Sequence, residues 1–182
     1  MNISSNHNLY ALLVAHFPAD RDGCCIETED GLFYSWHDIE QASAKIANLL
    51  ASLNLQRGAR IAIQVPKSAE AVILYLASLR SGAVFVPLNT AYQAAEIRYF
   101  LQDAEPEVVI CSPQNLEWVS QIATQVGCKH IFTLSEQRSG SLLDRASDMS
   151  SQFDTVVSTP DELAAILYTS GTTGRSKGAM LS

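Results

Sequence analysis

Short apolar runs alternate along most of the chain with longer segments in which apolar residues recur every three or four positions. The longer segments predict amphipathic helices, and the apolar runs predict strands. The predicted strands cover residues 60–65, 83–86, 108–111, 131–134 and 163–167. They carry almost no polar residue, which is typical of strands covered by helices on both faces. Because strands that alternate with such helices imply βαβ units, we predict an α/β fold with a mostly parallel sheet.

Polar residues that can cap helices mark where the predicted helices begin. Ser35 and Asp38 form an S-x-x-D capping signature ahead of the first long helix. Ser68 can cap a second helix, which is apolar nearly all round and is therefore expected to be buried. Thr90 and Gln93 predict a capping box that opens a third helix.

Three features are expected at the surface. The stretch 135–160 contains seven serines and few apolar residues, so we predict a surface connection with one short helix. The apolar strand 163–167 that follows it is expected to form an edge of the sheet. Arg80 and Arg98 lie within predicted helices, and we expect both to be exposed surface charges.

Composition narrows the class of protein. The chain has 182 residues, of which 47% are hydrophobic, and a net charge of −7. This apolar content supports a packed core and excludes intrinsic disorder. An acidic chain is a poor candidate for binding nucleic acid or an anionic membrane surface. No segment reaches the ~18 apolar residues that a membrane-spanning helix needs, so we expect no membrane span.

The cysteines and the amino-terminal residues bear on location and metal binding. Cys24, Cys25, Cys111 and Cys128 form no C-x-x-C pair and have no histidine at metal-ligand spacing, so we predict no metal site. We interpret them as reduced thiols of a cytoplasmic protein. The chain has no Lys or Arg before Arg21, so we expect neither a secretory signal nor a transit peptide.

The segment 168–178 reads Y-T-S-G-T-T-G-R-S-K-G and differs from the rest of the chain. Its glycines permit positive φ and close approach of the backbone to a ligand, and successive N–H groups in such a turn form an anion-binding concavity. Arg175 and Lys177 add positive charge, and no acidic residue follows Tyr168. The segment is not a Walker A loop, because Ser176 and Gly178 stand where that motif requires glycine and a hydroxyl residue. We predict a polyphosphate-binding loop, and the alternative is a surface turn that binds nothing.

Residues 168–178 resemble the phosphate-binding signature Y-T-S-G-T-T-G-x-P-K-G of the AMP-forming adenylating enzymes, which include acyl-CoA synthetases, peptide-synthetase adenylation domains and luciferases. Ser176 replaces the usual proline, from which we expect a somewhat less rigid loop with its function kept. Residues 79–88 resemble a second signature of this family, L-x-x-G-[AG]-x-[YF]-[VL]-P-[LI]. The sequence P-L-N-T-A-Y at 87–92 is most similar to malonyl-CoA synthetases.

The resemblance implies a site and a reaction. In this family the loop joins two strands and holds the β- and γ-phosphates of ATP, with hydroxyls as donors, glycines for clearance and a loop lysine. The phosphate-binding residues implied here are Thr169, Ser170, Gly171, Thr172, Thr173, Gly174 and Lys177. The implied reaction activates a small-molecule carboxylate with Mg²⁺·ATP as an acyl-adenylate, releasing pyrophosphate. Coenzyme A then displaces AMP to give a thioester.

Members of this family are roughly three times as long as this chain. We therefore expect residues 1–182 to be an incomplete, amino-terminal portion of the AMP-binding domain, inactive alone, with no catalytic residue assigned within it. The parent protein is expected to be a malonate–CoA ligase. Two alternatives stay open: a CoA ligase for another short or medium carboxylic acid, and a non-catalytic module that binds a nucleotide or a protein partner.

Overall fold

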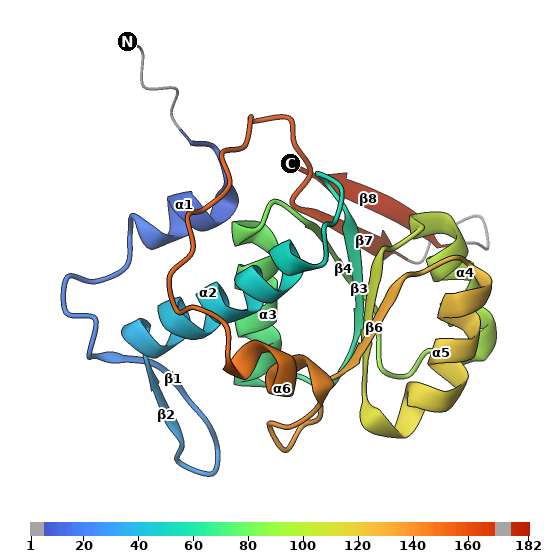
Figure 1. Ribbon diagram of the computed structural model, residues 1–182, viewed down its shortest axis with the longest axis horizontal. Coiled ribbons are helices and arrows are strands. Elements are labelled where there is room, and N and C mark those ends of the chain that lie inside the picture. Colours follow the sequence, from blue (N-terminus) through green and yellow to red (C-terminus); the bar gives the residue numbers. More distant parts are fainter. Residues whose placement is uncertain (1–5, 170–175) are drawn as a thin grey trace.

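A central six-stranded sheet organises the molecule, for which a computed structural model describes residues 6–169 and 176–182 (Figure 1). The strand order is β6-β5-β3-β4-β7-β8. The strands are β3 (Arg60–Gln64), β4 (Val84–Pro87), β5 (Val108–Cys111), β6 (His130–Thr133), β7 (Ala165–Thr169) and β8 (Lys177–Leu181). All pairs are parallel except β7 with β8, which is antiparallel. The predicted α/β fold with a mostly parallel sheet is confirmed.

Helices cover both faces of this sheet (Figure 1). One face carries α1 (Leu9–Val14), α2 (Trp36–Ser52), α3 (Ala69–Arg80) and α6 (Ser141–Ser147), and the other carries α4 (Ala94–Ala104) and α5 (Leu116–Gln125). A hydrophobic core lies on each face of the sheet, and alternate residues of β3 point into one or the other. Ile61 and Ile63 pack with α2 and α3, whereas Ala62 packs with α4 and α5. A small antiparallel hairpin, β1 (Cys24–Glu27) and β2 (Phe33–Ser35), precedes α2, and a 3-10 turn, η1 (Pro113–Asn115), precedes α5.

Two predicted helix starts are confirmed and one is wrong. Ser35 and Asp38 form a reciprocal capping box at α2, and the Ser68 hydroxyl accepts a hydrogen bond from the Ala71 amide at α3. At α4 the capping box joins Gln93 and Glu96, not Thr90 and Gln93. The structure shows why. The Asn89 side chain accepts a hydrogen bond from the Ala91 amide and holds residues 89–92 in a turn, so the helix starts three residues later.

Arg80 is buried, which corrects the expectation of an exposed charge. Its side chain is only 7% exposed. The guanidinium donates hydrogen bonds to the carbonyl oxygens of Glu40 (2.9 Å) and Phe153 (2.8 Å) and lies 4.8 Å from the centre of the Tyr10 ring. Arg80 therefore ties α2, α3, α1 and the segment after α6 together. Arg98 is exposed, as expected, and donates a hydrogen bond to Gln125.

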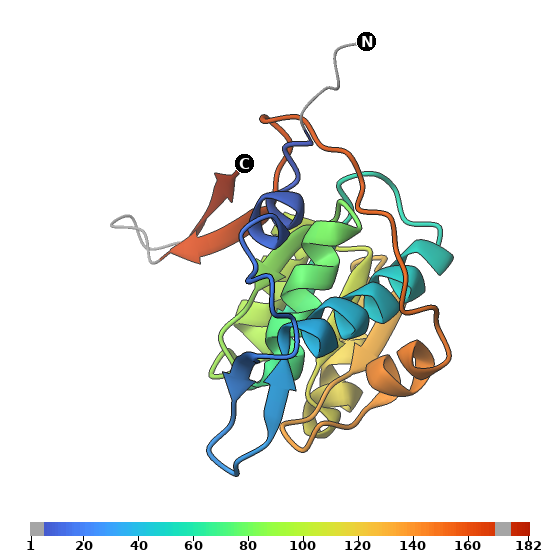
Figure 2. The same cartoon turned by 90° about the vertical axis from the view of Figure 1, so that its left-hand side faces the viewer.

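The segment from 135 to 160 runs along the α2–α3 side of the molecule (Figure 2). Within it, Leu142 and Ala146 of α6 are fully or nearly fully buried against α2. The side-chain amide of Asn48 on α2 donates hydrogen bonds to the carbonyl oxygens of Ser150 and Gln152, both at 2.8 Å. Hydrogen bonds to main-chain carbonyls thus hold a segment that has little regular structure of its own.

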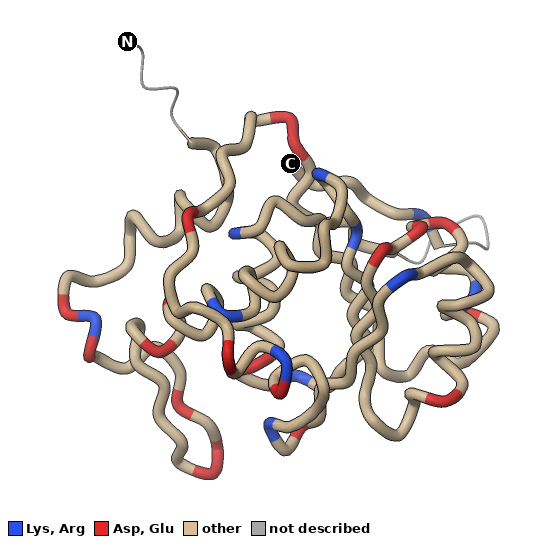
Figure 3. Tube along the Cα trace, viewed as in Figure 1, with Lys and Arg blue, Asp and Glu red and all other residues tan. Residues whose placement is uncertain are grey.

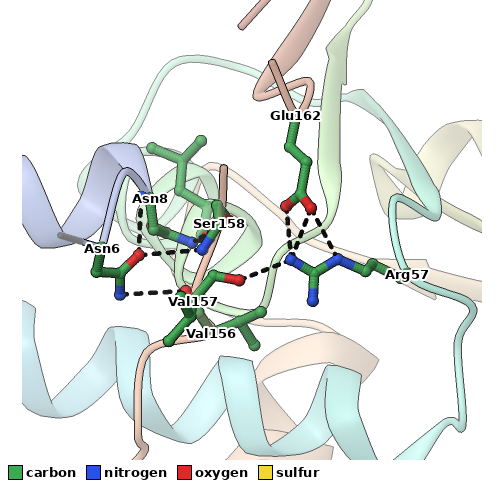
Figure 4. Close-up of polar contacts among 8 residues, drawn as sticks. Asn6, Asn8, Arg57, Val156, Val157, Ser158 and Glu162 are labelled. Atoms are coloured by element: carbon green, nitrogen blue, oxygen red, sulfur yellow. Dashed lines mark hydrogen bonds and ion pairs between the residues drawn. The ribbon is translucent and has the colours of Figure 1, made fainter. Parts of the chain in front are cut away.

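The amino-terminal residues are attached to the end of this same segment (Figure 4). The Asn6 side chain accepts a hydrogen bond from the main-chain N–H of Ser158, and the Asn8 side-chain amide donates to the carbonyl oxygen of Leu79 at 2.7 Å. Close by, Arg57 and Glu162 form a bidentate ion pair, and the hydrogen bonds from Arg57 hold the pKa of Glu162 below its usual range. These contacts join the chain before α1 to the chain before β7.

The strand after this segment, β7, is not the sheet edge. It pairs with β4 on one side and with β8 on the other, so β8 takes the edge position and the expectation for 163–167 is wrong. The sequence did not predict β8 from its apolar pattern because all five of its residues are exposed. No helix among the described residues is long and apolar enough to cross a membrane.

Candidate functional site

The β7–β8 hairpin places the two ends of the predicted loop, Thr169 and Lys177, at the carboxyl edge of the parallel sheet. Tyr168 pairs with Gly178 and Thr169 with Lys177, so Thr169 and Lys177 face each other at the base of the loop. In open α/β sheets, ligands bind beyond the carboxyl ends of the strands. The other predicted site residues, Ser170, Gly171, Thr172, Thr173 and Gly174, lie outside the described residues.

Thr169 and Lys177 present their side chains to solvent. Both residues are exposed, and no ion pair joins Lys177 to any residue that the structure describes. The exposed Lys177 side chain therefore places a cation at the base of the loop. Figure 3 shows acidic and basic residues interspersed along the described trace, without the basic stripe that nucleic-acid-binding faces carry.

Tyr168 fixes the strand that leads into the loop. Its ring packs on Phe100 of α4, with 4.5 Å between the ring centroids, and its hydroxyl donates a 2.6 Å hydrogen bond to Asp103. Burial and the neighbouring Asp103 carboxylate raise the pKa of Tyr168, because both disfavour the phenolate. The hydroxyl therefore stays a donor throughout the physiological range.

Gly178 makes room for the side chain of Ile166 on β7. A Cβ atom at position 178 would lie 2.8 Å from Ile166 Cγ2 and 3.4 Å from Tyr168 Cε1. The backbone there lies within strand β8 and has no positive φ. The glycine is therefore required by the close approach of the Ile166 side chain, and not by an unusual backbone conformation.

Helix α4 also contacts the strand that leaves the loop. The Tyr99 hydroxyl donates a 2.6 Å hydrogen bond to the carbonyl oxygen of Ser176. Tyr99 and Asp103 are four residues apart and so lie on one face of α4. Sequence reasoning missed both residues. Their helical spacing was visible, but their partners lie 77 and 65 positions away along the chain.

Other groups that could carry chemistry do not gather in the described part of the protein. It contains no cluster of three His, Cys, Asp or Glu side chains that could hold a metal ion. Burial raises the pKa of the Cys111 thiol to about 11 and also raises that of Cys128, so neither is a ready nucleophile. A cavity of about 300 Å³ beside Arg57, Arg60 and Val84 opens at the amino ends of the strands, away from the loop.

The chain matches a known protein family and the fold of solved structures. Residues 14–182 match the family described as AMP-binding enzyme. The chain belongs to this family. It is 46% identical to MatB from Rhodopseudomonas palustris, whose ATP-bound crystal structure superposes with a TM-score of 0.92 over 97% of this chain and 35% of that one. MatB thus shows that a protein with this fold binds ATP.

Curated relatives in the AMP-binding enzyme family include CoA ligases. Oxalate–CoA ligase of Arabidopsis thaliana is 30% identical over 80% of this chain and 28% of its own length. Medium-chain fatty-acid–CoA ligase of Escherichia coli is 30% identical over 88% of this chain and 30% of its own length. The chain therefore spans about a third or less of the relatives that it matches.

Proposed function

We propose that the protein carrying this chain is an ATP-dependent carboxylate–CoA ligase, and that residues 168–178 bind the phosphates of ATP. One observation carries the proposal. The hydroxyl- and glycine-rich segment joins β7 to β8 at the edge where α/β sheets bind ligands, in a chain 46% identical to an ATP-binding protein. Residues 1–182 are then the amino-terminal part of the AMP-binding domain.

The proposed reaction has two steps. A carboxylate oxygen of the acid attacks the α-phosphorus of Mg²⁺·ATP, the bond from that phosphorus to the bridging oxygen breaks, and pyrophosphate leaves with the bonding electrons. The sulfur of coenzyme A then attacks the acyl carbon of the adenylate. AMP leaves, the thiol proton passes to solvent, and a thioester remains.

The loop contributes to the first step. Negative charge grows on the pyrophosphate as the bond to the α-phosphorus breaks, and donors already in place stabilise that charge. The Lys177 ammonium and the Thr169 hydroxyl stand at the base of the loop, and the hydroxyls and amides of residues 170–174 extend the donor set. Removal of one such donor typically raises the barrier by about 3 kcal/mol.

We propose malonate as the acid. The P-L-N-T-A-Y sequence at 87–92, which is most similar to malonyl-CoA synthetases, favours malonate over the acids named for the curated relatives. The test is carboxylate-dependent exchange of pyrophosphate into ATP by the full-length protein, with malonate, methylmalonate, acetate and a medium-chain acid. We expect the highest kcat/KM with malonate. If only the monocarboxylic acids support exchange, malonate is not the substrate. If none of these acids supports exchange, the protein is not a carboxylate–CoA ligase.

We also propose that the reaction takes place in the cytoplasm. All four cysteines are free thiols, two exposed or half-buried and two buried, as expected where thiols stay reduced. Fractionation of cells that express the tagged full-length protein would test this, and recovery with a membrane or extracellular fraction would contradict it.

A further inference from the structure

Helix α4 contacts both strands of the hairpin at the points where they meet the loop. Asp103 accepts the hydroxyl hydrogen of Tyr168, one residue before the Thr169–Lys177 pair, and Tyr99 donates to the carbonyl oxygen of Ser176, one residue after the undescribed segment. Both bonds measure 2.6 Å. The pairing of β7 with β8 sets the separation of the two strands at the base of the loop, and one turn of α4 adds an anchor outside the loop to each of them.

Packing around these two hydrogen bonds gives them a defined geometry. The Tyr99 ring lies 5.3 Å from that of Phe100, which also contacts the rings of Tyr168 and Tyr92. Tyr99 and Tyr168 are both partly buried by this aromatic cluster. Packed rings have few alternative positions, so each hydroxyl is already aimed at its partner before any ligand arrives.

Ser176 gives the Tyr99 bond a particular role. Proline, which the family signature has at this position, would fix φ at about −65° and restrict the preceding residue as well. Serine imposes neither restriction, and it stands next to Lys177, the cation at the base of the loop. An outside hydrogen bond to the Ser176 carbonyl can supply the order that the serine backbone lacks.

We propose that Tyr99 is a positioning residue for ATP, which replaces the missing proline by holding the Ser176 carbonyl and so places Lys177 for the phosphates. The proposal rests on the proposed function of the loop. A packing role for Tyr99 would affect all substrates alike. A positioning role instead predicts that loss of the Tyr99 hydroxyl affects ATP alone, and that the size of this effect depends on the residue at position 176.

The test is a double-mutant cycle in the full-length protein with Tyr99→Phe and Ser176→Pro. Tyr99→Phe keeps the ring and removes one hydrogen bond, and we expect the KM and Kd for Mg²⁺·ATP to rise about fivefold. The KM values for the acid and coenzyme A should not change. In the Ser176→Pro background, where the carbonyl acceptor remains but the backbone is restricted, removing the hydroxyl should change ATP binding less than about twofold.

Tyr92→Phe is the matched control. Its ring also packs on Phe100, with 4.8 Å between centroids, and its hydroxyl makes no hydrogen bond among the described residues. We expect no change in ATP binding from this variant. The proposal is wrong if Tyr99→Phe raises the KM values for ATP, the acid and coenzyme A equally. It is also wrong if Tyr99→Phe has the same effect on ATP binding with serine and with proline at position 176.

Calorimetric binding of Mg²⁺·ATP separates this inference from the proposed function. If the wild-type protein binds ATP but exchanges no pyrophosphate, the ligase assignment fails and the binding cycle still decides the role of Tyr99. If the wild-type protein does not bind ATP, both fail. A fivefold loss of ATP affinity on Tyr99→Phe, absent when residue 176 is proline, supports the positioning role for any acid substrate.

Discussion

Substitution of the last glycine in the loop signature separates a packing role from a ligand-binding role. Gly178→Ala places a Cβ 2.8 Å from Ile166 Cγ2, so the buried Ile166 side chain must move or the hairpin must shift, whereas the 3.4 Å approach to Tyr168 Cε1 is ordinary contact. Overpacking of this kind costs about 1–3 kcal/mol. We expect the free energy of unfolding, measured by urea denaturation, to fall by about 2 kcal/mol.

A matched glycine provides the control. Gly23 has no positive φ, and a Cβ there would come no closer than 3.6 Å to Asp20, which is ordinary contact. Gly23→Ala should therefore change stability by less than about 0.5 kcal/mol. If Gly178→Ala leaves stability unchanged but abolishes ATP binding, the glycine serves the ligand directly and the packing explanation is wrong. Partial recovery of stability by Ile166→Ala in the Gly178→Ala background would support the packing explanation.

Three further predictions concern stability. The pKa of Tyr34 is raised to about 12, first by burial and then by its hydrogen bond to Glu70. The stability that this adds is complete below pH 10 and is lost as the pH rises from 10 to 12. Because solvent screens this partly exposed group, urea denaturation across that range should show wild type losing about 1 kcal/mol more than Tyr34→Phe, and parallel curves would contradict this. Arg80→Leu leaves main-chain carbonyls without donors and should cost about 3 kcal/mol; a neutral result in denaturant would show that the buried guanidinium is dispensable. Gly140→Ala combines a φ of +135° with a Cβ only 2.4 Å from the Thr133 carbonyl oxygen and should cost more than Gly178→Ala; equal midpoints in denaturant would refute that ranking.

Local patterns were sufficient to predict most of the sheet and two helix starts. The strands β3 and β5 are apolar because both of their faces are covered, and this burial is visible as unbroken apolar runs. Ser35 and Asp38 cap α2 through bonds that span only three residues, so their spacing is enough to identify them. At α4 the capping box lies three residues beyond the predicted one, because the Asn89 side chain holds residues 89–92 in a turn.

Features that depend on distant partners were not predictable in this way. Arg80 has the sequence context of a surface arginine at a helix end, and it is buried because α1 and the segment around Phe153 pack over it. Tyr99 and Asp103 look like ordinary residues of an amphipathic helix until β7 and β8 are placed beside them. The sequence identified the loop by its composition, whereas the residues that hold its ends became visible only with the fold.

The most direct test of the central claim separates the two half-reactions in the full-length protein with Thr172→Ala and Lys177→Ala combined. If this loop stabilises the departing pyrophosphate, adenylate formation, followed as malonate-dependent pyrophosphate exchange, should fall by about 100-fold or more. Thioester formation from preformed malonyl-adenylate and coenzyme A should stay within about twofold of wild type, because no pyrophosphate takes part in that step. Equal losses in both half-reactions would contradict the role assigned to residues 168–178.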